Sequence, residues 1–132
     1  AGLFNREIFL NFQFKIDKIK DDLLKFLLGE IEKGKKIYAY GAAAKGNTLL
    51  NFAGIKSDLI EAVFDKSPGK INKFLPGSHV PILDVNEIVK HCPDYILILP
   101  WNLKDEISDQ LKGQLPSHTV LITAIPELKV FK

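Results

Sequence analysis

Small residues and one lysine make up the stretch best suited to chemistry, YAYGAAAKGNTLLNF, from Tyr38 to Phe52. This stretch passes from a strand-like run through a tight turn into a short apolar helix pattern. A helix N-terminus carries free backbone amides and a partial positive charge, and Lys45 lies beside this one. The combination favours a phosphate group. A narrow turn with a solvated lysine is the simpler alternative.

Two phosphate-binding templates fit the stretch in part. Gly41 and Gly46 have the P-loop spacing, and Thr48 supplies its hydroxyl. Asn47 stands where the P-loop has its lysine, so hydrolysis of a nucleoside triphosphate is not expected. Gly41, Ala43 and Gly46 fill the dinucleotide pattern G-x-G-x-x-G with one alanine, whose methyl limits how closely a pyrophosphate approaches.

Asp65 adds a second match to a nucleotide site. In dinucleotide sites an acid about 20 residues beyond the glycines holds the ribose hydroxyls, and Asp65 ends the next predicted strand. Ligands of open parallel sheets bind beyond the carboxyl ends of the strands, so residues that follow each strand should meet there. The predicted binding site comprises Tyr40, Gly41, Ala43, Lys45, Gly46, Asn47, Thr48, Asp65, Trp101 and Asn102.

Other polar and aromatic residues leave alternatives open. Trp101 can stack on a base or sugar, or it can pack against the next helix with Asn102 as the N-cap. His79 is the candidate catalytic residue, as a general base, and an ordinary loop histidine is its alternative. His91 and Cys92 are adjacent but lack further ligands at metal spacing, so no metal is expected. The GxSxG pattern of serine hydrolases is missing.

Hydrophobic periodicity predicts the elements that position these residues. A long helix is expected from Arg6 to Lys33, with an apolar stripe of Ile8, Phe12, Ile16, Ile19, Leu23, Leu27 and Ile31. A second apolar row lies on roughly the opposite side and comprises Leu10, Phe14, Leu24 and Leu28. Something outside this chain is expected to cover that row.

Strands and helices alternate in the rest of the chain. Strands are predicted over residues 35–40, 59–65, 95–99, 120–123 and 128–131, and helices over 47–53, 85–91 and 103–112. A long loop, residues 66–81, is a candidate functional loop. This order predicts an α/β, Rossmann-like fold with a mostly parallel sheet and helices on both faces. Residues 1–34 would be a docking helix and 35–132 the Rossmann-like domain, together one compact domain.

Composition limits the class of partner. The 132 residues are 46% hydrophobic and carry a net charge of +2, so no broad field favours nucleic acid or a membrane surface. No apolar run approaches the roughly 20 residues that span a bilayer. The single cysteine excludes a disulfide framework and fits a reducing cytoplasm. Methionine is absent even at the first position, which predicts a piece of a larger protein.

Three segments in the same order and with similar spacing carry a resemblance to a known family. YGAAAKGNTLLNFAGI, VFDKSPGKINKFLPGSHVPI and YILILPWN resemble the C-terminal domain of the C-methyltransferases that act on nucleotide-linked deoxysugars. Enzymes of that family have a zinc-binding N-terminal segment, a central S-adenosylmethionine-binding domain and a C-terminal Rossmann-like domain. The resemblance implies that this chain holds the nucleotide-sugar during methyl transfer to a carbon beside a keto group.

The chain departs from a complete enzyme of that family. It lacks the cysteines of the zinc segment and a second glycine loop for S-adenosylmethionine, which would be bound mainly by another domain. We therefore expect no catalysis by this chain alone, and we expect its N-terminal helix to dock on the rest of the parent methyltransferase. A stand-alone NAD- or coenzyme A-binding module and a ligand-free interaction domain remain the alternatives.

Overall fold

The computed structural model describes residues 2–125 and 128–131. It begins with a long helix, α1 (Gly2–Glu32). The helix ends just before Gly34, which has a φ of 84°. Glycine adopts this left-handed conformation at no steric cost, and it therefore stops the helix here. The predicted helix is confirmed, with an earlier start. Among the described residues, none of the helices is long and apolar enough to cross a membrane.

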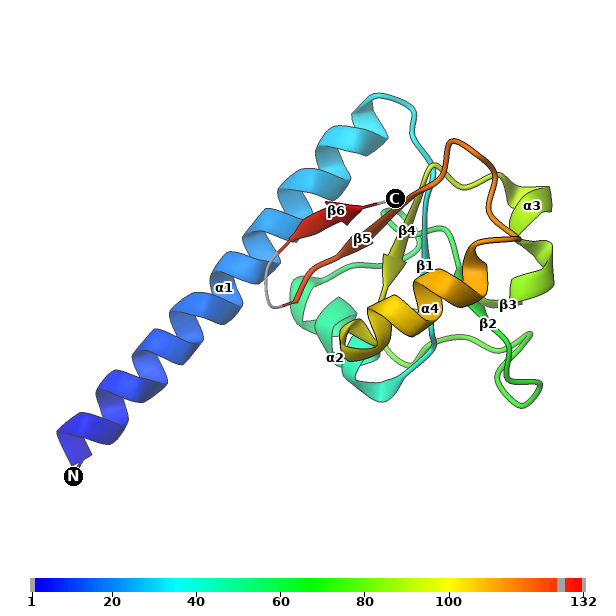
Figure 1. Ribbon diagram of the computed structural model, residues 1–132. Coiled ribbons are helices and arrows are strands. Elements are labelled where there is room, and N and C mark those ends of the chain that lie inside the picture. Colours follow the sequence, from blue (N-terminus) through cyan, green and yellow to red (C-terminus); the bar gives the residue numbers. More distant parts are fainter. Residues whose placement is uncertain (1, 126–127, 132) are drawn as a thin grey trace.

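Six strands form one sheet in the order β3-β2-β1-β4-β5-β6 (Figure 1). They are β1 (Ile37–Tyr40), β2 (Val63–Asp65), β3 (Ile82–Asp84), β4 (Tyr95–Ile98), β5 (Val120–Thr123) and β6 (Lys129–Phe131). The first five are parallel, and β6 runs antiparallel to β5. The strand order reverses between β1 and β4, as in Rossmann folds, which confirms the predicted fold class.

Helices cover both faces of the sheet. They are α2 (Ala44–Ala53), α3 (Ile88–His91) and α4 (Lys104–Leu111), with 3₁₀ turns at Val85–Glu87 and Trp101–Leu103. Alternate residues of β1 point to opposite faces. Ile37 packs in the core under α1 and α2, and Tyr38 packs in the core under α3 and α4.

Two strands differ from the prediction. The strand expected over residues 59–65 is only β2, because Leu59 and Ile60 both donate backbone hydrogen bonds to the Lys56 carbonyl and close a turn. Strand β3 was not predicted. Its three residues follow a long loop and lead directly into a 3₁₀ turn, so they are too few to show an alternating pattern.

The two ends of α1 differ in burial. Leu23 and Leu27 are fully buried against the sheet, whereas Leu10, Phe12 and Phe14 are 53%, 61% and 71% exposed. Phe12 belongs to the predicted apolar stripe but is exposed, because the start of α1 extends beyond the sheet (Figure 1).

The rest of the predicted pattern on α1 holds in part. Of the second row, Leu28 is exposed, while Leu24 packs partly against the core. The side chain of Ile8 lies outside the described residues.

Candidate functional site

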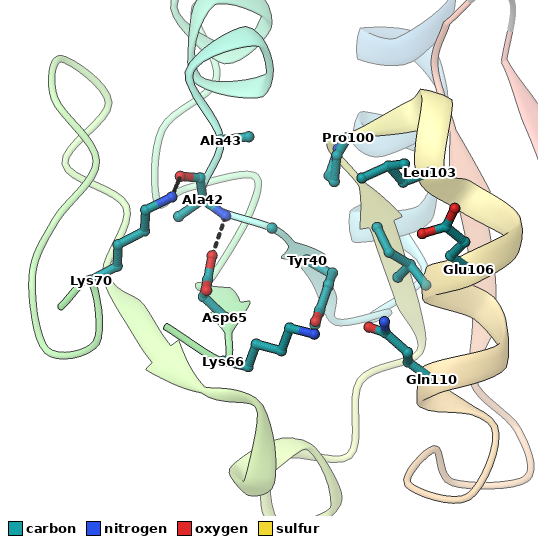
Figure 2. Close-up of a pocket in the computed structure, with 12 residues that line it drawn as sticks. Tyr40, Ala42, Ala43, Asp65, Lys66, Lys70, Pro100, Leu103, Glu106 and Gln110 are labelled. Carbon is teal, nitrogen blue, oxygen red and sulfur yellow. Dashed lines mark hydrogen bonds between the residues drawn. The ribbon is translucent and has the colours of Figure 1, made fainter. Parts of the chain in front are cut away.

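A cleft of about 350 Å³ opens at the carboxyl edge of the sheet (Figure 2). The turn after β1, the segment after β2 and helix α4 form its walls. Its polar side chains are Tyr40, Asp65, Lys66, Lys70, Glu106 and Gln110. The cleft lies where the strand order reverses, which is the place where open α/β sheets bind ligands.

The turn from β1 into α2 depends on two glycines. Gly41 has a φ of 91°, and a Cβ atom there would lie 2.6 Å from Pro100 Cδ. A Cβ atom on Gly46 would overlap the side chain of Leu99. Both glycines thus allow the turn and the first turn of α2 to pack tightly against the end of β4. Packing against Pro100 and Leu99 is therefore sufficient to explain why both positions are glycine, without a bound phosphate.

Charged side chains hold both polar groups of the Ala42 backbone. Asp65 Oδ2 accepts the Ala42 N–H at 2.8 Å, and Lys70 Nζ donates to the Ala42 carbonyl at 2.9 Å (Figure 2). The other oxygen of Asp65 accepts the Ser67 N–H at 2.8 Å. The residue Asp65 is only 9% exposed. These contacts, which we call the Ala42 clamp, join the segment after β2 to the turn after β1.

The N-terminus of α2 is left open. Its N-cap is Ala43, and no described side chain caps the helix there. The first hydrogen bond of the helix runs from the Asn47 N–H to the Ala43 carbonyl at 3.0 Å, so the preceding amides have no intrahelical acceptor. Asn47 Oδ1 is also buried without a hydrogen-bond partner among the described residues. This end of α2 therefore retains free polar groups and a partial positive charge.

Tyr40 supplies a neutral hydroxyl inside the cleft. Burial of its ring raises the pKa of the phenol, and the charge of Asp65 adds to the effect. Figure 2 shows the ammonium of Lys66 directed toward this hydroxyl, with Gln110 and Glu106 on the facing wall. The cleft thus combines a phenol that stays protonated at neutral pH, ammonium groups, a carboxylate and an amide.

Several predicted site residues lie in a different hollow. Lys45, Thr48 and Trp101 line a space of about 380 Å³ next to α1 and α2, which shares no lining residue with the cleft. Lys45 Nζ lies 6.0 Å from the centre of the Trp101 ring. Thr48 Oγ1 donates to the Ala44 carbonyl at 3.0 Å, within its own helix.

Asn102 is exposed and belongs to neither set of lining residues. It does not cap α4 either, because the N-cap of that helix is Leu103.

Comparison with known proteins identifies the family. The C-methyltransferase C-terminal domain family matches residues 1–126. The chain belongs to this family. C-methyltransferase NovU from Streptomyces niveus is 32% identical over 129 residues, which are 98% of this chain and 31% of that protein. This C-methyltransferase C-terminal domain thus spans about a third of the length of that curated relative. The resemblance to a C-methyltransferase C-terminal domain is confirmed.

A solved structure also aligns with part of this chain. UDP-D-quinovosamine 4-dehydrogenase from Vibrio fischeri aligns with 74% of this chain and 93% of that chain, at a TM-score of 0.49 and 21% identity.

The histidines of the C-methyltransferase domain lie away from the cleft. His79 is exposed and precedes β3, so it lies toward the edge at which the parallel strands begin. His91 Nδ1 lies 3.4 Å from the Tyr38 hydroxyl, and His91 Nε2 lies 3.9 Å from Glu87 Oε2. Over the described parts of the chain, no three His, Cys, Asp or Glu side chains gather as a metal site would require.

Four polar residues that line the cleft were not named among the predicted site residues. Lys66 and Lys70 belong to the loop of residues 66–81, which the rule that places ligands after parallel strands marked as a candidate without singling out these lysines. Glu106 and Gln110 lie one helical turn apart on α4, where a four-residue spacing puts both on one face. The sequence contained this signal, but nothing in it showed that this face borders the turn after β1.

Proposed function

We propose that this domain holds the nucleotide-linked sugar substrate of an S-adenosylmethionine-dependent C-methyltransferase. The observation that carries the proposal is the cleft at the strand-order reversal, with Lys66 and Lys70 on one wall and Glu106 and Gln110 on the other. The reaction class would be methyl transfer to a sugar carbon beside a keto group.

The diphosphate of such a substrate suits the wall that carries the lysines. Lys66 is exposed at the cleft, and Lys70 uses one of its three N–H donors on the Ala42 carbonyl. Two ammonium groups beside an uncapped helix N-terminus favour an anion in charge-assisted hydrogen bonds.

The sugar suits the facing wall. Glu106 accepts hydrogen bonds, Gln110 donates and accepts them, and Tyr40 keeps its proton, so hydroxyl and keto groups would find partners. The volume of about 350 Å³ is near the lower end of the roughly 300–1,000 Å³ typical of ligand pockets. The cleft would therefore enclose part of a nucleotide-sugar, and the rest would lie beyond it.

S-adenosylmethionine supplies the methyl group, but the residues of this chain do not fit its ribose. The acid that would hold ribose hydroxyls is Asp65, whose two oxygens accept the N–H groups of Ala42 and Ser67. Because both oxygens are engaged and the residue is only 9% exposed, a ribose would reach this carboxylate poorly. We assign the cofactor to another part of the methyltransferase, and the same observation weakens the alternative of an NAD- or coenzyme A-binding module.

Substitution of Lys66 in the complete methyltransferase tests the proposal. Lys66→Gln should raise the KM for the nucleotide-sugar by about tenfold, the effect of losing one charge-assisted hydrogen bond of about 1.4 kcal/mol, with the KM for S-adenosylmethionine unchanged. Lys73→Gln is the matched control, because Lys73 is exposed in the same loop but does not line the cleft. An unchanged KM for the nucleotide-sugar in Lys66→Gln would refute the proposal.

A further inference from the structure

An apolar groove lies between α1 and α2 and shares no lining residue with the cleft. Ile16, Leu49, Phe52, Trp101 and Ile125 provide its apolar lining and enclose about 380 Å³. We call this surface the α1–α2 groove. Phe12 extends it along α1, because Phe12 lines an adjoining hollow together with Ile16 and Ile125.

The apolar side chains described near the start of α1 are largely not packed against the rest of this domain. Leu10, Phe12 and Phe14 are each more than half exposed, with Phe12 on one side of the helix and Leu10 and Phe14 on roughly the opposite side. A helical segment shorter than about 12–15 residues is marginal in water unless it packs against something. An exposed, apolar and largely unpacked segment therefore marks a surface that another protein part covers.

The groove and the cleft lie at the same edge of the sheet. The end of α1 is fixed at the amino edge, where Tyr95, the first residue of β4, donates to Glu30 at 3.0 Å. The start of α1 consequently extends past the carboxyl edge. Lys45 and Trp101 follow β1 and β4 at this edge. An occupant of the groove would stand beside the mouth of the cleft.

We infer that the rest of the C-methyltransferase docks in the α1–α2 groove. The alignment with C-methyltransferase NovU covers 98% of this chain but only 31% of NovU. Most of such an enzyme therefore lies outside this domain. The inference rests on family membership and is independent of the substrate proposed above. It also gives Lys45 and Trp101 a docking role in place of the predicted substrate contact.

The charges around the groove define the chemistry of the docked surface. Lys20 Nζ lies 5.4 Å from the centre of the Phe52 ring, and Lys45 Nζ lies 6.0 Å from that of Trp101. Lys15 also borders the adjoining hollow. The docked surface therefore has an apolar centre, which fills the groove, and a rim of Asp and Glu facing these lysines.

Hydrogen exchange in the complete methyltransferase tests the docking. Phe52 is 44% exposed, so Phe52→Glu should leave the domain core intact while placing a charge in the interface. We expect the amides of residues 10–19 to exchange roughly tenfold faster or more in this variant, as when an interface loses a buried aromatic anchor. Phe74→Glu is the matched control, since Phe74 is 63% exposed and lies outside the groove.

Strands β1 and β4 report on folding in the same experiment. Their amides should exchange at the wild-type rate, and if they do not, Phe12→Glu replaces Phe52→Glu because Phe12 is more exposed. Equal exchange of residues 10–19 in wild type and in the groove variant would overturn the inference. A wild-type enzyme that sediments as a dimer and dissociates on substitution would also overturn it, because a second copy would then be the occupant.

Discussion

At the scale of single residues, Asp65 occupies the position where dinucleotide sites have a ribose-binding acid, but its carboxylate binds the backbone of this chain. Its two oxygens accept two backbone N–H groups, and it is nine-tenths buried. Asp65→Asn would leave one of these N–H groups facing an NH₂ group. We expect the free energy of unfolding to fall by about 1–3 kcal/mol.

Urea denaturation checks this prediction. Asp58→Asn is the control, because Asp58 is exposed in a turn and should change stability by no more than about 0.5 kcal/mol. Equal stability of the two variants would show that the Ala42 clamp does not stabilise the fold.

At the scale of elements, the turn between β1 and α2 is fixed by the conformation of Gly41. A φ of 91° disfavours any other residue, and a Cβ atom would press on the ring of Pro100. We expect Gly41→Ala to lower the free energy of unfolding by about 1–3 kcal/mol or more. Gly113→Ala should be nearly neutral, because a Cβ atom there meets nothing within 4 Å. Thermal unfolding of both variants would decide; a neutral Gly41→Ala would contradict the account.

Helices and strands could be predicted from the sequence more completely than the contacts between residues that lie far apart in it. The alternation of apolar runs was sufficient for β1, β4, β5 and the long helix, and Gly54 correctly marks the end of α2. The three residues of β3 have too little pattern to be found. The separation of Lys45 and Trp101 from the cleft was not visible either, because it depends on which face of the sheet each side chain reaches after its strand ends.

At the scale of the whole molecule, the buried phenol of Tyr38 should make the stability of the fold depend on pH in the alkaline range. Burial, followed by the charge of Glu61, raises the pKa of Tyr38 from 10.0 to about 12. Between these values the unfolded chain loses the phenolic proton and the folded chain keeps it, so unfolding is favoured as pH rises. Stability should therefore be intact below pH 10 and fall between pH 10 and about 12. Denaturation midpoints of Tyr38→Phe should fall less steeply over this window; an equal slope would contradict the prediction.

The long first helix differs in burial between its two ends. Its buried end belongs to the core under α2, and its exposed end carries apolar side chains beyond the sheet (Figure 1). The two predicted apolar rows lie on opposite sides of the helix, whereas burial in the structure differs mainly between its two ends.

If the cleft binds the diphosphate of a nucleotide-sugar, as we propose, the amides around it should respond to a nucleoside diphosphate. The most direct measurement is an amide chemical-shift titration of this chain with thymidine diphosphate, S-adenosylmethionine and NAD in parallel. We expect shifts with thymidine diphosphate at residues 41–43, 65–70 and 106–110, and none of comparable size with the other two. Silence with thymidine diphosphate, or shifts with NAD or S-adenosylmethionine alone, would contradict the proposal.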